Sequence, residues 1–96
     1  MTIRWSPTAV ADLTHLRSFT AAHDSAAAAR VAHGILEAVE KLETWPALGR
    51  PGRLPHTREL VIPGTPFVVP YTVAGDGIRI IAVIHSARSW PEASES

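Results

Sequence analysis

Residues 2–5 alternate polar and apolar side chains, which predicts a short first strand. Ser6-Pro7 follows directly. This pair is typical of a helix start, because the serine hydroxyl accepts an otherwise unpaired amide and proline has no amide to leave unpaired. Apolar residues then recur every three or four positions, which predicts an amphipathic helix over residues 7–22. The stripe consists of Ala9, Val10, Leu13, Leu16 and Thr20.

A second helical pattern follows a polar turn at residues 23–25. It predicts a helix over residues 26–43, with its apolar stripe at Val31, Ile35, Ala38, Val39, Leu42 and Trp45. Residues 26–29 are all alanine, and Gly34 has no side chain. Because small residues let two helices approach closely, we expect an antiparallel helical hairpin.

Trp45-Pro46 ends the second helix, and residues 47–56 are too rich in proline and glycine for regular structure. A loop of this length that carries Arg50 and Arg53 favours a functional use over a plain connection, although solvated surface arginines are the simpler alternative.

Three β-rich runs, separated by turns that contain proline or glycine, predict an antiparallel meander over residues 57–62, 67–73 and 78–85. Pro70 lies inside the second run, and because proline cannot donate to a ladder, we expect a local irregularity there. The whole pattern predicts an α+β fold, β-α-α-β-β-β, in which the helical hairpin packs on a mainly antiparallel sheet. We expect one domain over residues 1–91 and a frayed acidic tail over residues 92–96.

Composition narrows the class of protein. The chain has 96 residues, 46% of them hydrophobic, and no cysteine, which excludes disulfides, thiolate nucleophiles and zinc fingers. We also expect no signal peptide and no membrane span, so the sequence favours a cytoplasmic protein. The net charge is zero, but residues 50–91 carry five arginines against two acidic residues. This excess indicates either a local anion-facing surface or ordinary surface arginines.

The candidate chemistry is limited. The five histidines have no metal-binding spacing, and the sequence has neither a serine-hydrolase elbow nor a phosphate-binding loop, so we expect no metal and no cofactor. What remains is a basic set at Arg50, Arg53, Arg58, His85 and Arg88. Such a set can hold or cleave RNA, or it can hold the carboxylates of a partner protein. Arg58 could equally satisfy a buried carbonyl and serve only the fold.

Four segments, in the family's order, resemble the RelE/ParE superfamily of bacterial toxins, and the resemblance extends over nearly the whole chain. They are the run around Trp5-Ser6-Pro7, residues 42–52, Thr57-Arg58-Glu59-Leu60 and residues 83–91. The resemblance implies the toxin of a type II toxin–antitoxin module, with two helices packed on a small antiparallel sheet. It also implies a cognate antitoxin, ParD-like or RelB-like, that neutralises the toxin in a hetero-oligomer.

Within the superfamily, Gly49-Arg50-Pro51-Gly52 and Thr57-Arg58-Glu59-Leu60 most resemble the ParE-like branch, whose members are also called plasmid stabilisation proteins. That branch implies a toxin that binds DNA gyrase and is not an enzyme. The target-binding residues would then be Arg50, Arg53, Arg58, His85, Arg88 and Trp90. Trp90 is equally well explained as a core anchor.

Two alternatives stay open. A RelE-like toxin would cut mRNA on the ribosome with His85, Arg88 and Arg58, but the arginine that this branch carries on its middle strand falls on Val68 here, and no tyrosine follows His85. A decayed remnant would only bind its antitoxin. By resemblance, we expect an antitoxin helix to pack along the helical hairpin.

Overall fold

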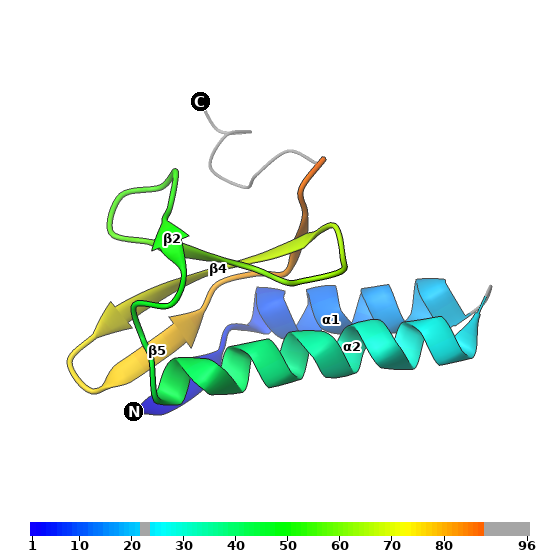
Figure 1. Cartoon of the computed structure of the whole chain (residues 1–96), viewed down its shortest axis with the longest axis horizontal. Coiled ribbons are helices and arrows are strands. Elements are labelled where there is room, and N and C mark those ends of the chain that lie inside the picture. The colour runs from blue at the N-terminus through cyan, green and yellow to red at the C-terminus, as the bar shows by residue number, and fades with distance from the viewer. Residues whose placement is uncertain (22–23, 88–96) are drawn as a thin grey trace.

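The computed structural model describes residues 1–21 and 24–87, in which one strand and two helices are followed by five strands. The elements are β1 (Thr2–Trp5), α1 (Pro7–Ala21), α2 (Ser25–Glu40), a short 3₁₀ helix η1 (Lys41–Glu43), β2 (Arg50–Pro51), β3 (Arg58–Val61), β4 (Phe67–Ala74), β5 (Gly77–Ile80) and β6 (Ile84–His85). The helices lie side by side as a hairpin against one face of the sheet (Figure 1). The predicted α+β order is confirmed, and β2 and the split of the last strand are additions.

Both helices begin at side-chain caps. The Ser6 hydroxyl accepts a hydrogen bond from the Ala9 amide at 3.0 Å, and Asp24 Oδ1 accepts one from the Ala27 amide at 3.1 Å. Each bond satisfies an amide that has no partner within the first turn of its helix. The serine–proline start of α1 is therefore confirmed, and α2 starts one residue before the predicted alanine run.

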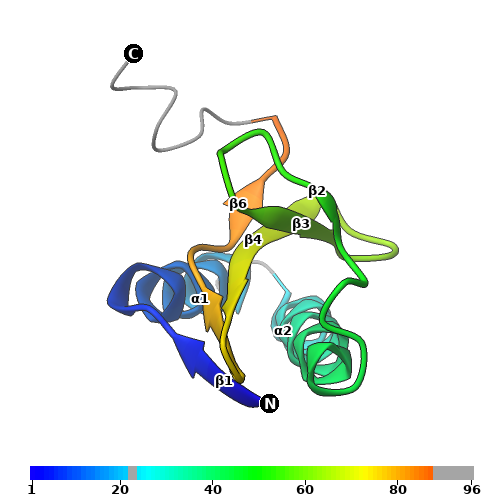
Figure 2. The ribbon, with the colours of Figure 1, turned by 90° about the vertical axis from the view of Figure 1, so that its left-hand side faces the viewer.

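The sheet has the strand order β1-β5-β4-β3-β2, and β6 pairs with the first part of β4. Strand β1 runs parallel to β5, and the other pairs are antiparallel. Figure 2 shows the two helices end-on with the sheet rising beside them. The fully buried core side chains come from both layers and include Ala9, Ile35, Leu42, Val69, Tyr71 and Ile80.

Of the stripe residues whose side chains the structure describes, a set that leaves out Thr20, two are exposed. Val10 is 51% exposed because Ala9, at 0%, occupies the core side of α1, and Trp45 is 60% exposed. Trp45 follows η1, whose tighter 3₁₀ turn shifts the phase of the residues after it away from the stripe of α2. The predicted single helix over residues 26–43 is thus an α-helix that ends at Glu40 and continues as η1.

The predicted strand 78–85 is interrupted. Tyr71 of β4 pairs with Ile80, and Val68 of β4 pairs with Ile84. Two residues of β4 lie between these pairs, opposite three residues of the partner segment, so the partner segment has one extra residue, as in a β-bulge. Pro70 lies at this point, and its carbonyl accepts a hydrogen bond from the Ile81 amide at 2.9 Å. An extended residue directs its amide and carbonyl to the same side, so the donor that proline lacks would have faced the interruption. The irregularity expected at Pro70 is therefore confirmed.

Helix α1 and the serine that caps it make hydrogen bonds to the backbone where the ladder is interrupted. The Ser6 hydroxyl donates to the Ile81 carbonyl at 2.7 Å, and the Val83 amide donates to Asp12 Oδ2 at 2.9 Å. Buried backbone groups require such partners. Ser6 and Asp12 therefore join the first helix to the segment that leads into β6.

Candidate functional site

The connection between η1 and β3 is held to the core by the hydroxyl of Tyr71. This side chain is fully buried; its hydroxyl donates to the Pro46 carbonyl at 2.8 Å and accepts from the Gly49 amide at 2.8 Å. Burial raises the pKa of the Tyr71 hydroxyl, and the hydrogen bond from Gly49 and the charge of Arg58 offset part of that rise. The neutral Tyr71 hydroxyl, through its two hydrogen bonds, thus fixes residues 46–49, where the segment that carries the arginines begins.

The two glycines of this segment are required by close packing. A Cβ atom at Gly49 would lie 2.7 Å from Tyr71 Cε1 and 2.9 Å from the Glu59 carbonyl oxygen, and one at Gly52 would collide with the Thr57 hydroxyl. The Gly49-Arg50-Pro51-Gly52 motif therefore has a structural cause. It places the backbone of β2 directly against β3.

The Glu59 carboxylate binds both Arg50 and Arg53. Its side chain is 4% exposed, and Oε1 accepts from Arg50 Nε at 3.2 Å and Nη2 at 3.0 Å. Oε2 accepts from the Arg53 amide at 2.8 Å and from Arg53 Nε at 3.2 Å. Burial alone would raise the pKa of Glu59, but the hydrogen bonds from Arg53 and Arg50 outweigh it and hold the pKa below its ordinary value. The carboxylate is therefore charged near neutral pH and offsets one of the two positive charges.

Arg58 lies on the opposite face of β3 from Glu59, because neighbouring side chains of a strand point to opposite sides. Its Nη1 donates to the Gly49 carbonyl at 2.7 Å and to the Ala47 carbonyl at 3.4 Å. Contact with a backbone carbonyl is one of the alternatives that the sequence left open for this residue. Arg58 lines a hollow of about 270 Å³ with Pro51, His56, Thr57 and Val73.

His85 lies at the other end of β4. It pairs with Phe67, and the two rings meet edge to face with their centroids 5.5 Å apart. The Ala87 amide donates to His85 Nδ1 at 3.1 Å, so in the neutral ring the proton belongs on Nε2. A neutral ring in this state can donate a hydrogen bond from Nε2, while the lone pair of Nδ1 is already engaged by the Ala87 amide.

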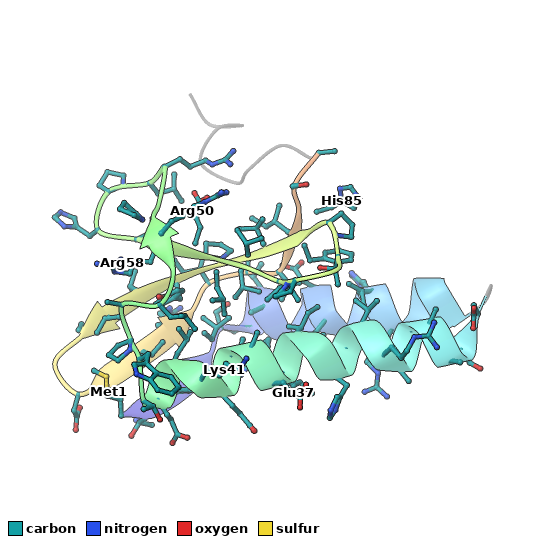
Figure 3. All side chains as sticks on the ribbon, in the orientation of Figure 1. Met1, Glu37, Lys41, Arg50, Arg58 and His85 are labelled. Atoms are coloured by element: carbon teal, nitrogen blue, oxygen red, sulfur yellow. The ribbon has the colours of Figure 1, made fainter. Side chains whose placement is uncertain are left out.

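The predicted site residues therefore do not share one surface. Arg50 and Arg53 both bind Glu59, whereas Arg58 lies on the other face of the sheet. Arg58 pairs with Tyr71 of β4, and His85 pairs with Phe67, four residues away on the same strand. Four strand residues span about 13 Å, and Figure 3 shows Arg58 and His85 at opposite ends of the sheet. Arg88 and Trp90 lie outside the described residues. The part that these six residues play in target binding stays a prediction.

Sequence reasoning missed a groove between the end of α2 and the free edge of β3. We call it the helix–strand groove. It encloses about 390 Å³ and is lined by Ala38, Lys41, Leu48, Gly49, Arg50, Glu59, Leu60, Val61 and Pro63. Leu48 and Val61 are 49% and 48% exposed on it. The only sequence signal was a leucine isolated within a loop rich in proline and glycine.

The described part of the chain contains no group of three or more metal-ligating side chains. None of the described helices is long and apolar enough to cross a membrane. The site is thus a set of arginines and an apolar groove at the β2–β3 edge of the sheet.

Comparison with known proteins places this architecture in the RelE/ParE superfamily of toxins. Residues 3–90 match the family described as the ParE toxin of the type II toxin–antitoxin system parDE. The chain belongs to this ParE toxin family.

Three relatives support the assignment. Y4kP of Sinorhizobium fredii, a protein named as a toxin, is 40% identical over 90 residues, which is 94% of this chain and 93% of Y4kP. The toxin RelE2 of Caulobacter vibrioides is 32% identical over 84 residues, covering 88% of this chain and 93% of RelE2. A solved structure of the chromosomal ParDE system from P. aeruginosa superposes with a TM-score of 0.80 at 27% identity, covering 88% of this chain and 95% of the matched chain.

Proposed function

We propose that this type II toxin inhibits growth by binding an essential protein, with DNA gyrase as the target, and that a cognate antitoxin neutralises it. The family assignment supports the toxin role. The distribution of charge supports binding over RNA cleavage: Glu59 neutralises part of the arginine set, and the described arginines do not surround His85. Cleavage would require positive charge and a proton-transferring group at one scissile phosphate.

Expression of the chain alone, under an inducible promoter, tests the mode of action. We expect thymidine incorporation to stop before methionine incorporation, and the purified chain to inhibit supercoiling by gyrase. Transcripts should stay intact during the arrest, with the unaltered chain and with His85→Ala alike. Early loss of methionine incorporation, with new transcript ends that disappear in His85→Ala, would instead establish the RelE-like endonuclease. Normal growth with a folded, antitoxin-binding chain would establish the inactive remnant.

The helix–strand groove is the surface that we assign to the antitoxin. It combines exposed apolar side chains at Leu48 and Val61 with positive charge from Lys41 and Arg50. Among the described lining residues the one carboxylate, that of Glu59, is already bound by arginines of the same chain. The groove therefore favours a partner segment that carries apolar and acidic side chains.

The edge of β3 adds a second means of binding. Strand β2 pairs with Arg58 and Glu59 alone, so among residues 1–21 and 24–87 Val61 has no neighbouring strand on that side. An extended antitoxin segment can hydrogen-bond to this edge while its side chains enter the groove. This assignment differs from the sequence-based expectation of an antitoxin helix along the hairpin, and the two are separable by mutation.

Co-purification with the product of the neighbouring gene tests the groove. We expect Val61→Glu to weaken antitoxin binding by tenfold or more. Val10→Glu, on an equally exposed valine of α1, serves as the matched control and should bind normally. Loss of binding in Val10→Glu or Leu36→Glu, with Val61→Glu unaffected, would place the antitoxin on the hairpin instead.

A further inference from the structure

We propose that the Arg58 hollow is a recognition pocket for a single carboxylate of a protein partner, an aspartate or glutamate side chain of an acidic peptide. The hollow is lined by Pro51, His56, Thr57, Arg58 and Val73 and lies apart from the lining of the helix–strand groove. This proposal deepens the protein-binding function above and rests on it only for the identity of the partner.

The hydrogen bonding of Arg58 leaves one edge of its guanidinium group open. Nη1 is engaged by the Gly49 and Ala47 carbonyls, whereas Nε and Nη2 have no hydrogen-bond partner among residues 1–21 and 24–87. The Nε–Nη2 edge presents two parallel donors, which match the two oxygens of a carboxylate. The carbonyls therefore hold the group in place with its carboxylate-binding edge unoccupied.

The same chain shows how its arginines use this edge. Arg50 binds Glu59 through Nε and Nη2, at 3.2 and 3.0 Å from Oε1. Glu59 thus serves Arg50 and Arg53, and within the described ranges no carboxylate lies within ion-pairing distance of Arg58. A half-buried guanidinium group without an opposing charge is an incomplete ion pair that a partner can complete.

The walls of the pocket favour a peptide over a nucleic acid. Pro51 and Val73 are apolar, and Val73 is 40% exposed beside Arg58, where it can pack against the aliphatic stem of an acidic side chain. A nucleic-acid backbone is bound by several cations in a row, whereas the described lining of this hollow contains one arginine and one histidine. His56 is held at φ 62°, and hydrogen bonds from Gly52 and Thr57 close the loop around it.

Titration of the full chain with short peptides tests the proposal without any need for toxicity. The probe is acetyl-Val-Glu-Val-amide, with acetyl-Val-Gln-Val-amide as its neutral match. The readouts are the Nε–H resonance of Arg58 and, in every variant, the backbone amide resonances of the lining residues Thr57 and Val73. We expect saturable binding of the glutamate peptide and at least tenfold weaker binding of the glutamine peptide. Arg58→Lys keeps the charge but removes the paired donors, and should weaken binding about tenfold.

Arg79→Lys is the matched control, because Arg79 is an exposed arginine of the same sheet, in β5, and does not line the hollow. It should bind the glutamate peptide normally. Equal binding of the two peptides, or normal binding by Arg58→Lys, would overturn the proposal. Tighter binding of inorganic phosphate or of a short RNA at the Arg58 resonance would overturn it in favour of nucleic acid. If Arg58→Lys fails to fold, the resonance of the unaltered chain still decides between these outcomes, and none of them depends on growth arrest.

Discussion

Replacement of Glu59 by alanine should destabilise the fold more than any other single loss of a charged side chain in this region. The Glu59 carboxylate is almost fully buried and accepts four hydrogen bonds, one of them from the Arg53 amide. Arg50 and Arg53 are themselves 55% and 50% exposed, so each ion pair contributes at most about 1 kcal/mol. The backbone bond adds about 1 kcal/mol. We therefore expect Glu59→Ala to lower the free energy of unfolding by about 2–3 kcal/mol.

Glu59→Gln separates charge from shape. Glutamine keeps the length of the side chain and one acceptor oxygen, so we expect a loss of about 1–2 kcal/mol. The measurement is urea unfolding followed by circular dichroism, with Asp76→Asn as the control because Asp76 is an exposed carboxylate in the turn before β5.

The lowered pKa of Glu59 determines how the free energy of unfolding changes with pH. The folded chain holds the pKa of Glu59 below its ordinary value, so between the two values the unfolded chain binds more protons. The stabilisation is therefore fully present above the ordinary value, about 4.3, and is lost as the pH falls through the folded value. The advantage of the unaltered chain over Glu59→Gln should shrink below about pH 4. Equal urea midpoints at pH 7, or a difference that stays constant down to pH 3, would refute the assignment of an ion-paired buried carboxylate.

Three further outcomes follow from the same structure. Gly49→Ala should cost about 1–3 kcal/mol because its Cβ atom would lie 2.7 Å from Tyr71 Cε1, whereas Gly34→Ala in α2, with open space around it, should stabilise the chain by up to about 1 kcal/mol in thermal unfolding. Tyr71→Phe should lower the free energy of unfolding by about 1–3 kcal/mol, because two hydrogen bonds of the hydroxyl are lost. Folding raises the pKa of Tyr71, so its stabilisation of the folded chain is present below about pH 10 and is lost as the pH rises through the folded value. Only the unaltered chain should show this alkaline loss. Asp12→Ala should cost about 1–2 kcal/mol and speed hydrogen exchange at the Val83 amide, whereas Asp24→Ala should leave that amide unchanged.

Local patterns were sufficient for the helices and most of the strands because each of these has a local cause. Ser6-Pro7 starts α1, Asp24 caps α2, and the alternation of residues 2–5 forms β1. Pro70 also predicted a break in the ladder, since the missing amide is a property of the residue itself. The position of the break in the partner strand was not predictable, because it depends on the register of β4 against β5 and β6.

The site was predictable only as a set of residue types. The sequence shows Arg50, Arg53 and Arg58, but their grouping depends on strand alternation and on the burial of Glu59. That burial could not be predicted, because a glutamate in a short strand is expected to be exposed. The pairing of Asp12 with the Val83 amide spans 71 positions and has no local signal.

The two helices, most of the strands and the turns between them were predictable from the sequence alone, because propensity, capping and periodicity act over a few residues. The resemblance to one toxin superfamily was also visible there, in four short segments. Tertiary structure decided which charges are neutralised, which guanidinium edge stays open and where an apolar groove faces solvent. Those properties depend on contacts between residues distant along the chain, and burial then sets the cost of leaving any of them unpaired.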